Sequence, residues 1–243
     1  MVNEELIAQQ PFKGKSAVIP GGSKGMGKET AKLFVQLGGS ACIIARGIDA
    51  LKETEEECNK LKSDDSQFVE IISCDTTDMD KLKPLLDDYI NSRGLPDYLF
   101  NFVGYAFVQY IEKLTLDDFK NNMNVNYYGQ LVPTLIIMPY FMEAKTGYIS
   151  FTSSIMGFMA VMGYTTYCPS KYALFGLAEV LRHELLPYNI KVSILFPTDT
   201  DTPGLAEENI LKPEECKIIS EIELTNEEEN TLTSLVIAHK NNT

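Results

Sequence analysis

A strand-like apolar run followed by a helical pattern recurs along almost the whole chain, and this alternation restricts the possible folds more than any other feature. Strands that alternate with helices pair in parallel through right-handed crossovers, because each helix carries the chain back to the same end of the sheet. The sequence therefore predicts an α/β fold with a doubly wound parallel sheet and helices on both faces. The predicted strands lie at 16–19, 41–45, 68–73, 98–102, 148–153 and 190–196.

The segments between these strands carry helix boundaries. Asp49, Asp78 and Thr115 stand where a side chain can cap the first turn of the helix that follows. Two prolines are expected to kink or shorten a helix over 126–143. Within one domain spanning 1–243, we expect a polar leader at 1–14, a helix at 164–187, a long substrate loop at 197–225 and a final helix at 227–239.

A glycine-rich turn joins the first predicted strand to the first helix. Gly21 permits a tight turn, Gly25 lets a pyrophosphate approach the backbone, and Gly27 lets the helix pack closely on the strand. The first N–H groups of the helix can then bind phosphate. Such a turn can also be a plain loop, but its position after the first strand favours a dinucleotide site. The remaining residues expected at this site are Ser23, Lys24 and Met26.

The residue after the second strand indicates which dinucleotide is bound. Sites for NAD place an acidic residue there, whereas this chain has Arg46. Together with Lys24 and Ser23, Arg46 can bind a 2′-phosphate, so NADPH is the favoured cofactor. The alternative is that these cations are solvated surface charges. Asp75, after the third strand, either accepts a hydrogen bond from the adenine amino group or caps the next helix.

Tyr167 and Lys171 are the candidate catalytic pair. On a helix they are i and i+4 and lie on one face, so the ammonium can lower the pKa of the phenol from its usual ~10 toward neutrality. Ser154, at the end of the fifth strand, can then hold a carbonyl oxygen while Tyr167 gives or takes the proton. Taken alone, the pair is more simply explained as a chance arrangement on an amphipathic helix.

Composition excludes several other classes of function. The formal net charge is −13 and no basic stripe is present, which argues against a nucleic-acid partner. The five cysteines are an odd number without a C-x-x-C pair, so we expect reduced thiols, no disulfide framework and no metal site. The longest apolar stretch, 131–142, is shorter than the roughly 20 residues of a membrane span, and no secretory leader is expected.

In their order and spacing, these motifs resemble those of the short-chain dehydrogenase/reductase family over essentially the whole chain. The resemblance implies one Rossmann-type domain in which Tyr167 is the acid/base, Lys171 lowers its pKa and holds the nicotinamide ribose, and Ser154 orients the carbonyl. It further implies that Asn126 anchors a proton-relay water. The remaining family positions, expected to line the cofactor, are Asp75, Asn101, Gly104, Pro197 and Thr202.

The stretch after the last strand narrows the resemblance. Residues 199–204, with 206–209, 212–213 and 219–221, resemble the branch that reduces the ketone of 3-ketodihydrosphingosine to dihydrosphingosine during sphingolipid synthesis. This implies a long-chain keto lipid substrate, NADPH, a location at the cytosolic face of the endoplasmic reticulum, peripheral membrane contact, and a homodimer or homotetramer. Members of that branch commonly carry membrane segments, and a further strand follows the last helix; neither is expected in this chain.

Some alternatives stay open. Another lipid-chain or steroid ketoreductase would share the catalytic residues, and a non-catalytic dinucleotide sensor is the candidate from a different class. Pro20 stands where the family has Thr, so it lacks the N–H expected to tie the glycine turn to the fourth strand. The apolar side chains of the substrate loop, Leu205 and Ile219 among them, either pack the loop onto the domain or form a lid over an alkyl chain.

Overall fold

The computed structural model describes residues 4–212, and a six-stranded parallel sheet lies at its centre. The strand order is β3-β2-β1-β4-β5-β6, and every neighbouring pair is parallel. The order reverses between β1 and β4, which places a crevice at the carboxyl ends of these strands. The predicted doubly wound sheet is confirmed. Its strands are β1 (Ser16–Pro20), β2 (Ser40–Ala45), β3 (Val69–Ser73), β4 (Tyr98–Phe100), β5 (Gly147–Thr152) and β6 (Ile190–Leu195).

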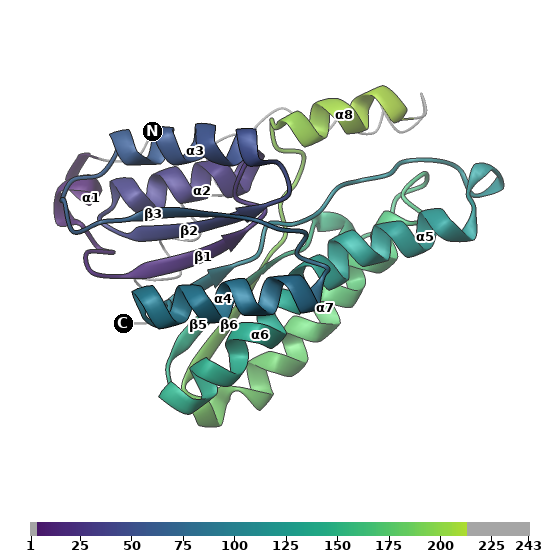
Figure 1. Ribbon diagram of the computed structural model, residues 1–243. Helices are drawn as coiled ribbons and strands as arrows, with labels where there is room; N and C mark the ends of the chain where they lie inside the picture. The colour runs from purple at the N-terminus through teal and green to yellow at the C-terminus, as the bar shows by residue number, and fades with distance from the viewer. Residues whose placement is uncertain (1–3, 213–243) are drawn as a thin grey trace.

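Helices cover both faces of the sheet. Figure 1 shows α2 and α3 on one face and α4, α6 and α7 on the other, while α5 and α8 extend beyond the same end of the sheet. The helices are α1 (Glu4–Gln9), α2 (Gly25–Gln36), α3 (Ile48–Lys60), α4 (Met79–Arg93), α5 (Leu116–Met123), α6 (Gly129–Ala144), α7 (Tyr167–Glu184) and α8 (Pro203–Leu211).

The two faces of the sheet bury separate hydrophobic cores. In β1, Val18 packs into the cluster shared with α4, α6 and α7, whereas Ala17 and Ile19 pack into the cluster shared with α2 and α3. Successive side chains of a strand point to opposite faces, so a strand covered on both sides is apolar at nearly every position. This explains why continuous apolar runs, rather than alternating ones, mark the strands in the sequence.

The N-terminal segment differs from the predicted polar leader. Its helix α1 places Leu6 and Ile7 against the core on the α2 side, and Phe12 lies buried with its ring centroid 4.5 Å from that of Phe34. The prediction of a polar leader is therefore wrong for residues 4–14. The apolar pair in α1 is too short to show a helical period in the sequence, so only packing against the domain reveals it.

Two of the three predicted helix caps are confirmed. The Asp78 carboxylate accepts a hydrogen bond from the Lys81 N–H at 3.1 Å, and Thr115 forms a reciprocal capping box with Asp118. The third prediction is wrong, because α3 begins at Ile48 with Gly47 as its cap, and Asp49 lies inside the first turn. There its carboxylate still complements the positive end of the helix dipole.

The predicted interruption of the helix over 126–143 falls at another place. A π-helical turn, Asn124–Tyr128, separates α5 from α6, whereas Pro133 and Pro139 lie inside α6. Helix α7 begins at Tyr167, later than predicted, because Tyr164 forms a β-bridge with Gln109.

The predicted substrate loop contains α8, which ends at Leu211. The rest of that loop from 213, the predicted helix at 227–239 and Cys216 lie outside the described residues. The other four cysteines are buried free thiols.

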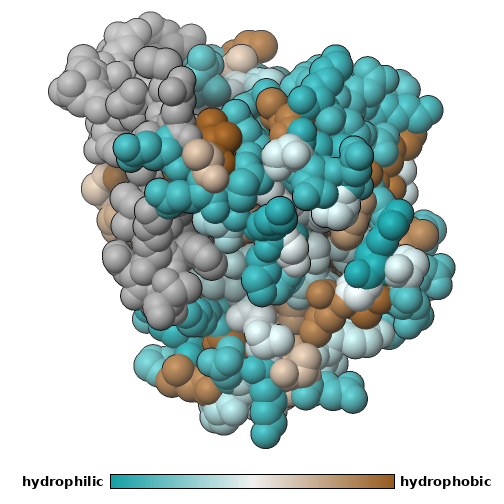
Figure 2. Space-filling view, turned by 90° about the vertical axis from the view of Figure 1, so that its left-hand side faces the viewer, coloured by the Kyte–Doolittle hydropathy of each residue, from teal (hydrophilic) through white to brown (hydrophobic). Residues whose placement is uncertain are grey.

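Two features are relevant to membrane contact: the hydropathy of the surface, and the length and apolar character of the helices. Over the part of the face not drawn in grey, Figure 2 shows mainly hydrophilic side chains with scattered hydrophobic ones. Among residues 4–212, no helix combines the length and the apolar character that a membrane crossing requires. The same residues contain no group of His, Cys, Asp and Glu side chains that could hold a metal ion.

Candidate active site

A cavity of about 140 Å³ lies at the carboxyl ends of the central strands. Its walls come from the glycine turn, the loop after β4, the end of β5, α7 and the segment that follows β6. Of the predicted catalytic residues, it brings together Ser154, Tyr167 and Lys171. The other predicted site residues on its walls are Met26, Gly104, Pro197 and Thr202.

Ser154 is buried directly after β5 and the following Ser153. Its hydroxyl oxygen accepts a hydrogen bond from the Met156 N–H at 3.2 Å, which caps the short helix Ile155–Gly157. The same hydroxyl is hydrogen-bonded to the Tyr167 phenol. Because these bonds hold the Ser154 hydroxyl beside the Tyr167 phenol, the two groups can contact the same small polar atom in the cavity.

Tyr167 is the first residue of α7, and its phenol faces the cavity. Burial raises the pKa of this phenol above its usual value of 10, while the hydrogen bond from Ser154 opposes the rise. The expected lowering of the Tyr167 pKa is therefore not found in this structure. Desolvation penalises the phenolate more than its polar neighbours stabilise it.

Lys171 lies one turn further along α7, as the i, i+4 spacing predicted. Its Nζ donates a hydrogen bond to the Thr152 carbonyl at 3.0 Å and lies 5.5 Å from the centroid of the Tyr167 ring. The side chain is buried, and desolvation lowers the pKa of Lys171 from 10.5 to about 7. The proton on this ammonium is consequently held weakly near neutral pH, which suits a group that takes part in proton movement.

Gln130 is a site residue that the sequence analysis missed. Its amide nitrogen donates to the carbonyls of Val103 and Thr152 at 2.8 and 2.9 Å, and its oxygen accepts from the Thr152 N–H at 3.0 Å. The side chain thereby holds both backbone polar groups of Thr152, whose carbonyl also binds Lys171. The available signal was a glutamine, fully buried here, at the start of an otherwise apolar helix.

Asn126 is buried in the π-helical turn and does not line the cavity. Its side chain exchanges hydrogen bonds with the backbone of Tyr105 at 2.8 and 3.0 Å and donates to Asn122 and Ser170 at 2.8 and 2.9 Å. These bonds tie the loop after β4 to α7 beside Lys171. The structure thus gives the side chain an anchoring role, and the predicted relay water remains a prediction.

The glycine turn has the close contacts that a dinucleotide site requires. Gly21 and Gly25 have φ values of +80° and +52°, and a Cβ at Gly21 would lie 2.7 Å from the Phe102 carbonyl carbon. A Cβ at Gly27 would overlap the Gly21 carbonyl oxygen. The turn is therefore closed to side chains, and the first N–H groups of α2 lack partners within the helix. Backbone of this shape fits a pyrophosphate.

Pro20 does not detach this turn from β4. Its carbonyl accepts a hydrogen bond from the Phe102 N–H at 2.8 Å, and the Gly21 N–H bonds the Ile44 carbonyl at 2.8 Å. The turn is thus tied to strands on both sides of β1. The missing N–H at position 20 leaves these two bonds intact.

The remaining predicted cofactor residues lie at different depths. Lys24 is exposed in the glycine turn, where Ser23 is half-buried. Arg46 is exposed directly after β2. Asp75 is exposed and accepts hydrogen bonds from the N–H and hydroxyl of Thr77, both at 2.9 Å, so it orders its own turn and does not cap α4.

Asn101 does not line the cavity. Its side chain is fully buried and donates to Thr134 at 3.3 Å, while its side-chain oxygen has no hydrogen-bond partner. Phe102 and Gly104 of the same segment line the cavity instead. Thr202 caps α8, and its side chain lies 3.3 Å from the position that a Cβ would take at Gly25, so the segment after β6 packs onto the glycine turn.

Comparison with known proteins agrees with this geometry. Residues 15–211 match the sequence model for short chain dehydrogenase. The chain belongs to the short-chain dehydrogenase family. Membership indicates a nicotinamide dinucleotide as the class of cofactor, which the closed glycine turn fits.

This short-chain dehydrogenase has similar relatives among curated proteins. It is 40% identical over 219 residues to 3-dehydrosphinganine reductase of Danio rerio, covering 89% of this chain and 66% of that protein. It is 39% identical over 227 residues to 3-ketodihydrosphingosine reductase of Dictyostelium discoideum, covering 86% of this chain and 67% of that protein. The chain thus spans about two thirds of the length of these relatives.

Among solved structures, a 3-oxoacyl-[acyl-carrier protein] reductase with bound NAD from Brucella melitensis has a similar fold. The TM-score is 0.77 at 25% identity, with 86% of this chain and 80% of that chain covered.

Proposed function

We propose that this short-chain dehydrogenase reduces the ketone of 3-ketodihydrosphingosine to dihydrosphingosine, with NADPH as the reductant. The observation that carries the proposal is the gathering of Ser154, Tyr167 and Lys171 around one cavity beside the glycine turn. The identity to relatives that are named as reductases of this ketone supports the substrate. A sensor without turnover would not need this arrangement of an acid, a cation and a hydroxyl.

The residues of the chain supply the polar part of the chemistry. When bound, the nicotinamide supplies the hydride for the carbonyl carbon. Ser154 holds the carbonyl oxygen by its hydroxyl, and Tyr167 donates the phenolic proton to that oxygen, so the product is an alcohol. Acid–base catalysis of this kind contributes roughly 10²–10⁴-fold to the rate. Lys171 places a positive charge beside the phenolate that results, and Gln130 holds the peptide to which Lys171 is bonded.

The preference for NADPH rests on the two cations at the nucleotide end. Neither Lys24 nor Arg46 forms an ion pair with another residue in the described range 4–212, and both are exposed. A 2′-phosphate between them would gain charge-assisted hydrogen bonds from both side chains and from the Ser23 hydroxyl.

The cellular setting follows from the substrate. We infer peripheral contact with the cytosolic face of the endoplasmic reticulum and assembly as a homodimer or homotetramer. Exposed apolar side chains around the start of α5, in the π-helical turn, between β5 and α7, and on α6 and α7 support these contacts. The exposed side chains are Ile111, Leu116, Phe158, Met159, Met162, Tyr128, Leu135, Tyr172 and Val180.

The test is NADPH oxidation with 3-ketodihydrosphingosine in detergent, compared with a short-chain ketone. The unmodified protein should consume NADPH with the long-chain ketone, and Tyr167→Phe should lower kcat by at least ~100-fold while NADPH still binds. If the protein reduced a steroid or another keto lipid but not 3-ketodihydrosphingosine, that ketone would be assigned as the substrate instead. Binding of NADPH without turnover of any ketone would establish the sensor instead, and near-normal kcat in Tyr167→Phe would overturn the role of the phenol.

A further inference from the structure

One wall of the catalytic cavity is acidic. Asp199 and Glu208, from the segment after β6, line the cavity together with Tyr164 and Tyr167. Their side chains are only 26% and 15% exposed. The one other charged side chain on the described walls is Lys171, which lies on α7 and is bonded to the Thr152 carbonyl. The wall formed by the segment after β6 is therefore lined by carboxylates that are largely withdrawn from bulk water.

Buried partners hold both carboxylates in place. The Tyr164 hydroxyl, on a side chain that is 2% exposed, donates to Glu208 at 2.5 Å. The Lys212 Nζ lies 3.1 Å from Glu208 and 3.4 Å from Asp199, and the Lys212 side chain has no exposed surface. Two carboxylates share one ammonium, so the group of Asp199, Glu208 and Lys212 carries one net negative charge.

That negative charge faces the catalytic tyrosine. The rings of Tyr164 and Tyr167 are neighbours, with centroids 5.9 Å apart, so the Glu208 carboxylate lies one aromatic side chain from the phenol. After burial, the charges of Glu208 and Asp199 are among the causes that raise the pKa of Tyr167. The two carboxylates thus oppose release of the phenolic proton, whereas Lys171 and a positive charge brought by the substrate favour it.

We propose that Glu208 and Asp199 bind the ammonium of a substrate that carries an amine on the carbon next to its ketone, and so select cationic over neutral ketones. The inference rests on the proposed function, since a 3-keto sphingoid base has its amine at this position. With the ketone oxygen at Ser154 and Tyr167, an adjacent ammonium must lie in the same cavity. No bond to nitrogen forms or breaks. The cation gains charge-assisted contacts and offsets the field that opposes loss of the Tyr167 proton.

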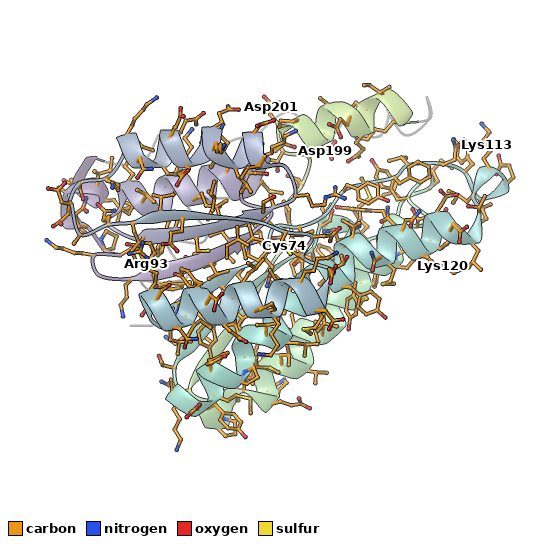
Figure 3. The ribbon with its side chains drawn as sticks, viewed as in Figure 1. Cys74, Arg93, Lys113, Lys120, Asp199 and Asp201 are labelled. Carbon is orange, nitrogen blue, oxygen red and sulfur yellow. The ribbon has the colours of Figure 1, made fainter. Side chains whose placement is uncertain are left out.

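The chain provides matched control variants. Glu207 is the exposed neighbour of Glu208 on α8, and Asp201 is the exposed counterpart of Asp199. Figure 3 shows Asp199 and Asp201 close together at the start of α8. Glu207→Gln and Asp201→Asn therefore remove the same charge from the same segment without touching the cavity wall.

The first experiment compares kcat/KM for 3-ketodihydrosphingosine and for its deamino analogue of equal chain length. The unmodified protein should prefer the amine at least tenfold, and Glu208→Gln and Asp199→Asn should each reduce this preference by roughly 10- to 100-fold, the effect of a lost charged contact. Values for the deamino ketone should not fall, because loss of a carboxylate removes a charge that opposes release of the Tyr167 proton, and the two control variants should keep the full preference. A misfolded variant would lose activity toward both substrates, and a thermal unfolding measurement would detect it. The variant of the other carboxylate would then test the inference.

A binding measurement tests the inference without turnover. Dissociation constants are measured for a long-chain 2-amino-1,3-diol and for the uncharged diol of equal length, both below their micelle thresholds. The amine should bind more tightly, and Glu208→Gln should abolish the difference. Equal binding of both ligands, or equal preference in Glu208→Gln and Glu207→Gln, would overturn the inference while leaving the reductase intact. A carboxylate-dependent preference in a protein that reduces neither ketone would instead overturn the proposed function alone.

Discussion

Replacing Lys171 by methionine should stabilise the protein, although it removes a residue of the active site. Burial lowers the pKa of Lys171 from 10.5 to about 7. One pKa unit corresponds to about 1.36 kcal/mol, so at low pH the buried ammonium costs folding on the order of 5 kcal/mol. Methionine has a similar length and carries no charge. Loss of the hydrogen bond to the Thr152 carbonyl offsets about 1 kcal/mol, because that carbonyl keeps its bond from Gln130 at 2.9 Å.

The stability gained through Lys171→Met should decrease as pH rises. Between pH 7 and 10.5 the unfolded chain holds a proton on Lys171 that the folded protein has released. The unmodified protein therefore becomes more stable with increasing pH at this residue, and the cost returns as pH falls from 10.5 to about 7, below which it stays constant. From pH 7 to 9 the difference between variant and parent should decrease from about 3–4 kcal/mol by about 2–3 kcal/mol.

The assay is urea unfolding of the protein without cofactor, followed by circular dichroism at pH 7 and pH 9. Lys52→Met is the control, because Lys52 is an exposed lysine on α3. Its free energy of unfolding should differ from that of the parent by less than about 0.5 kcal/mol at both pH values. A Lys171→Met variant that is less stable than the parent, or a difference that does not change with pH, would refute the reasoning.

Three further predictions concern the cofactor and the substrate. Replacing Lys24 and Arg46 together by alanine should weaken NADPH binding at least ~100-fold and leave NADH nearly unchanged, as titration would measure; equal losses would contradict a 2′-phosphate contact. Gly27→Ala should cost roughly 1–3 kcal/mol of unfolding free energy and lower dinucleotide affinity, because its Cβ would overlap main chain, whereas Gly176→Ala, with open space around it, should be neutral or stabilising. Finally, kcat/KM should rise with the chain length of 3-keto bases below their micelle threshold, since each buried methylene contributes about 0.8 kcal/mol, and Leu205→Asn in the cavity wall should flatten the slope; a flat series in the parent would reject an alkyl-covering lid.

The parallel sheet could be predicted from the sequence because its strands are buried on both faces. Continuous apolar runs such as 41–45 leave little choice of element, and the helices between them force parallel pairing. The glycine turn could also be predicted, since the packing of Gly27 against Gly21 is a contact within the turn itself, although the approach of Gly21 to Phe102 is not. Local patterns of this kind are visible because their cause is local.

The electrostatics of the site could not be predicted in the same way. The prediction that Tyr167 and Lys171 lie one turn apart on a helix was correct. The pKa of each, however, depends on how far the folded chain excludes water from the side chain. Gln130 reaches Val103 and Thr152, which lie far from it in sequence. Glu208 is one glutamate among several in its segment. Only the folded structure distinguishes it, because α8 places it at the cavity and Lys212 pairs with it.

The hydrogen bonds that Gln130 forms with the backbone of Thr152 have a consequence for the order in which the protein folds. Helix α6 carries Gln130 and, further along, Val132, Ile136 and Ile137 of the core shared with α4 and α7. A slip of α6 along its axis would break the hydrogen bonds of Gln130 to Thr152 and displace these core side chains together. The catalytic geometry and the last tight packing of that core therefore form in one step. During refolding, enzymatic activity should return with the near-ultraviolet signal of fixed aromatic rings, later than the far-ultraviolet signal of helix.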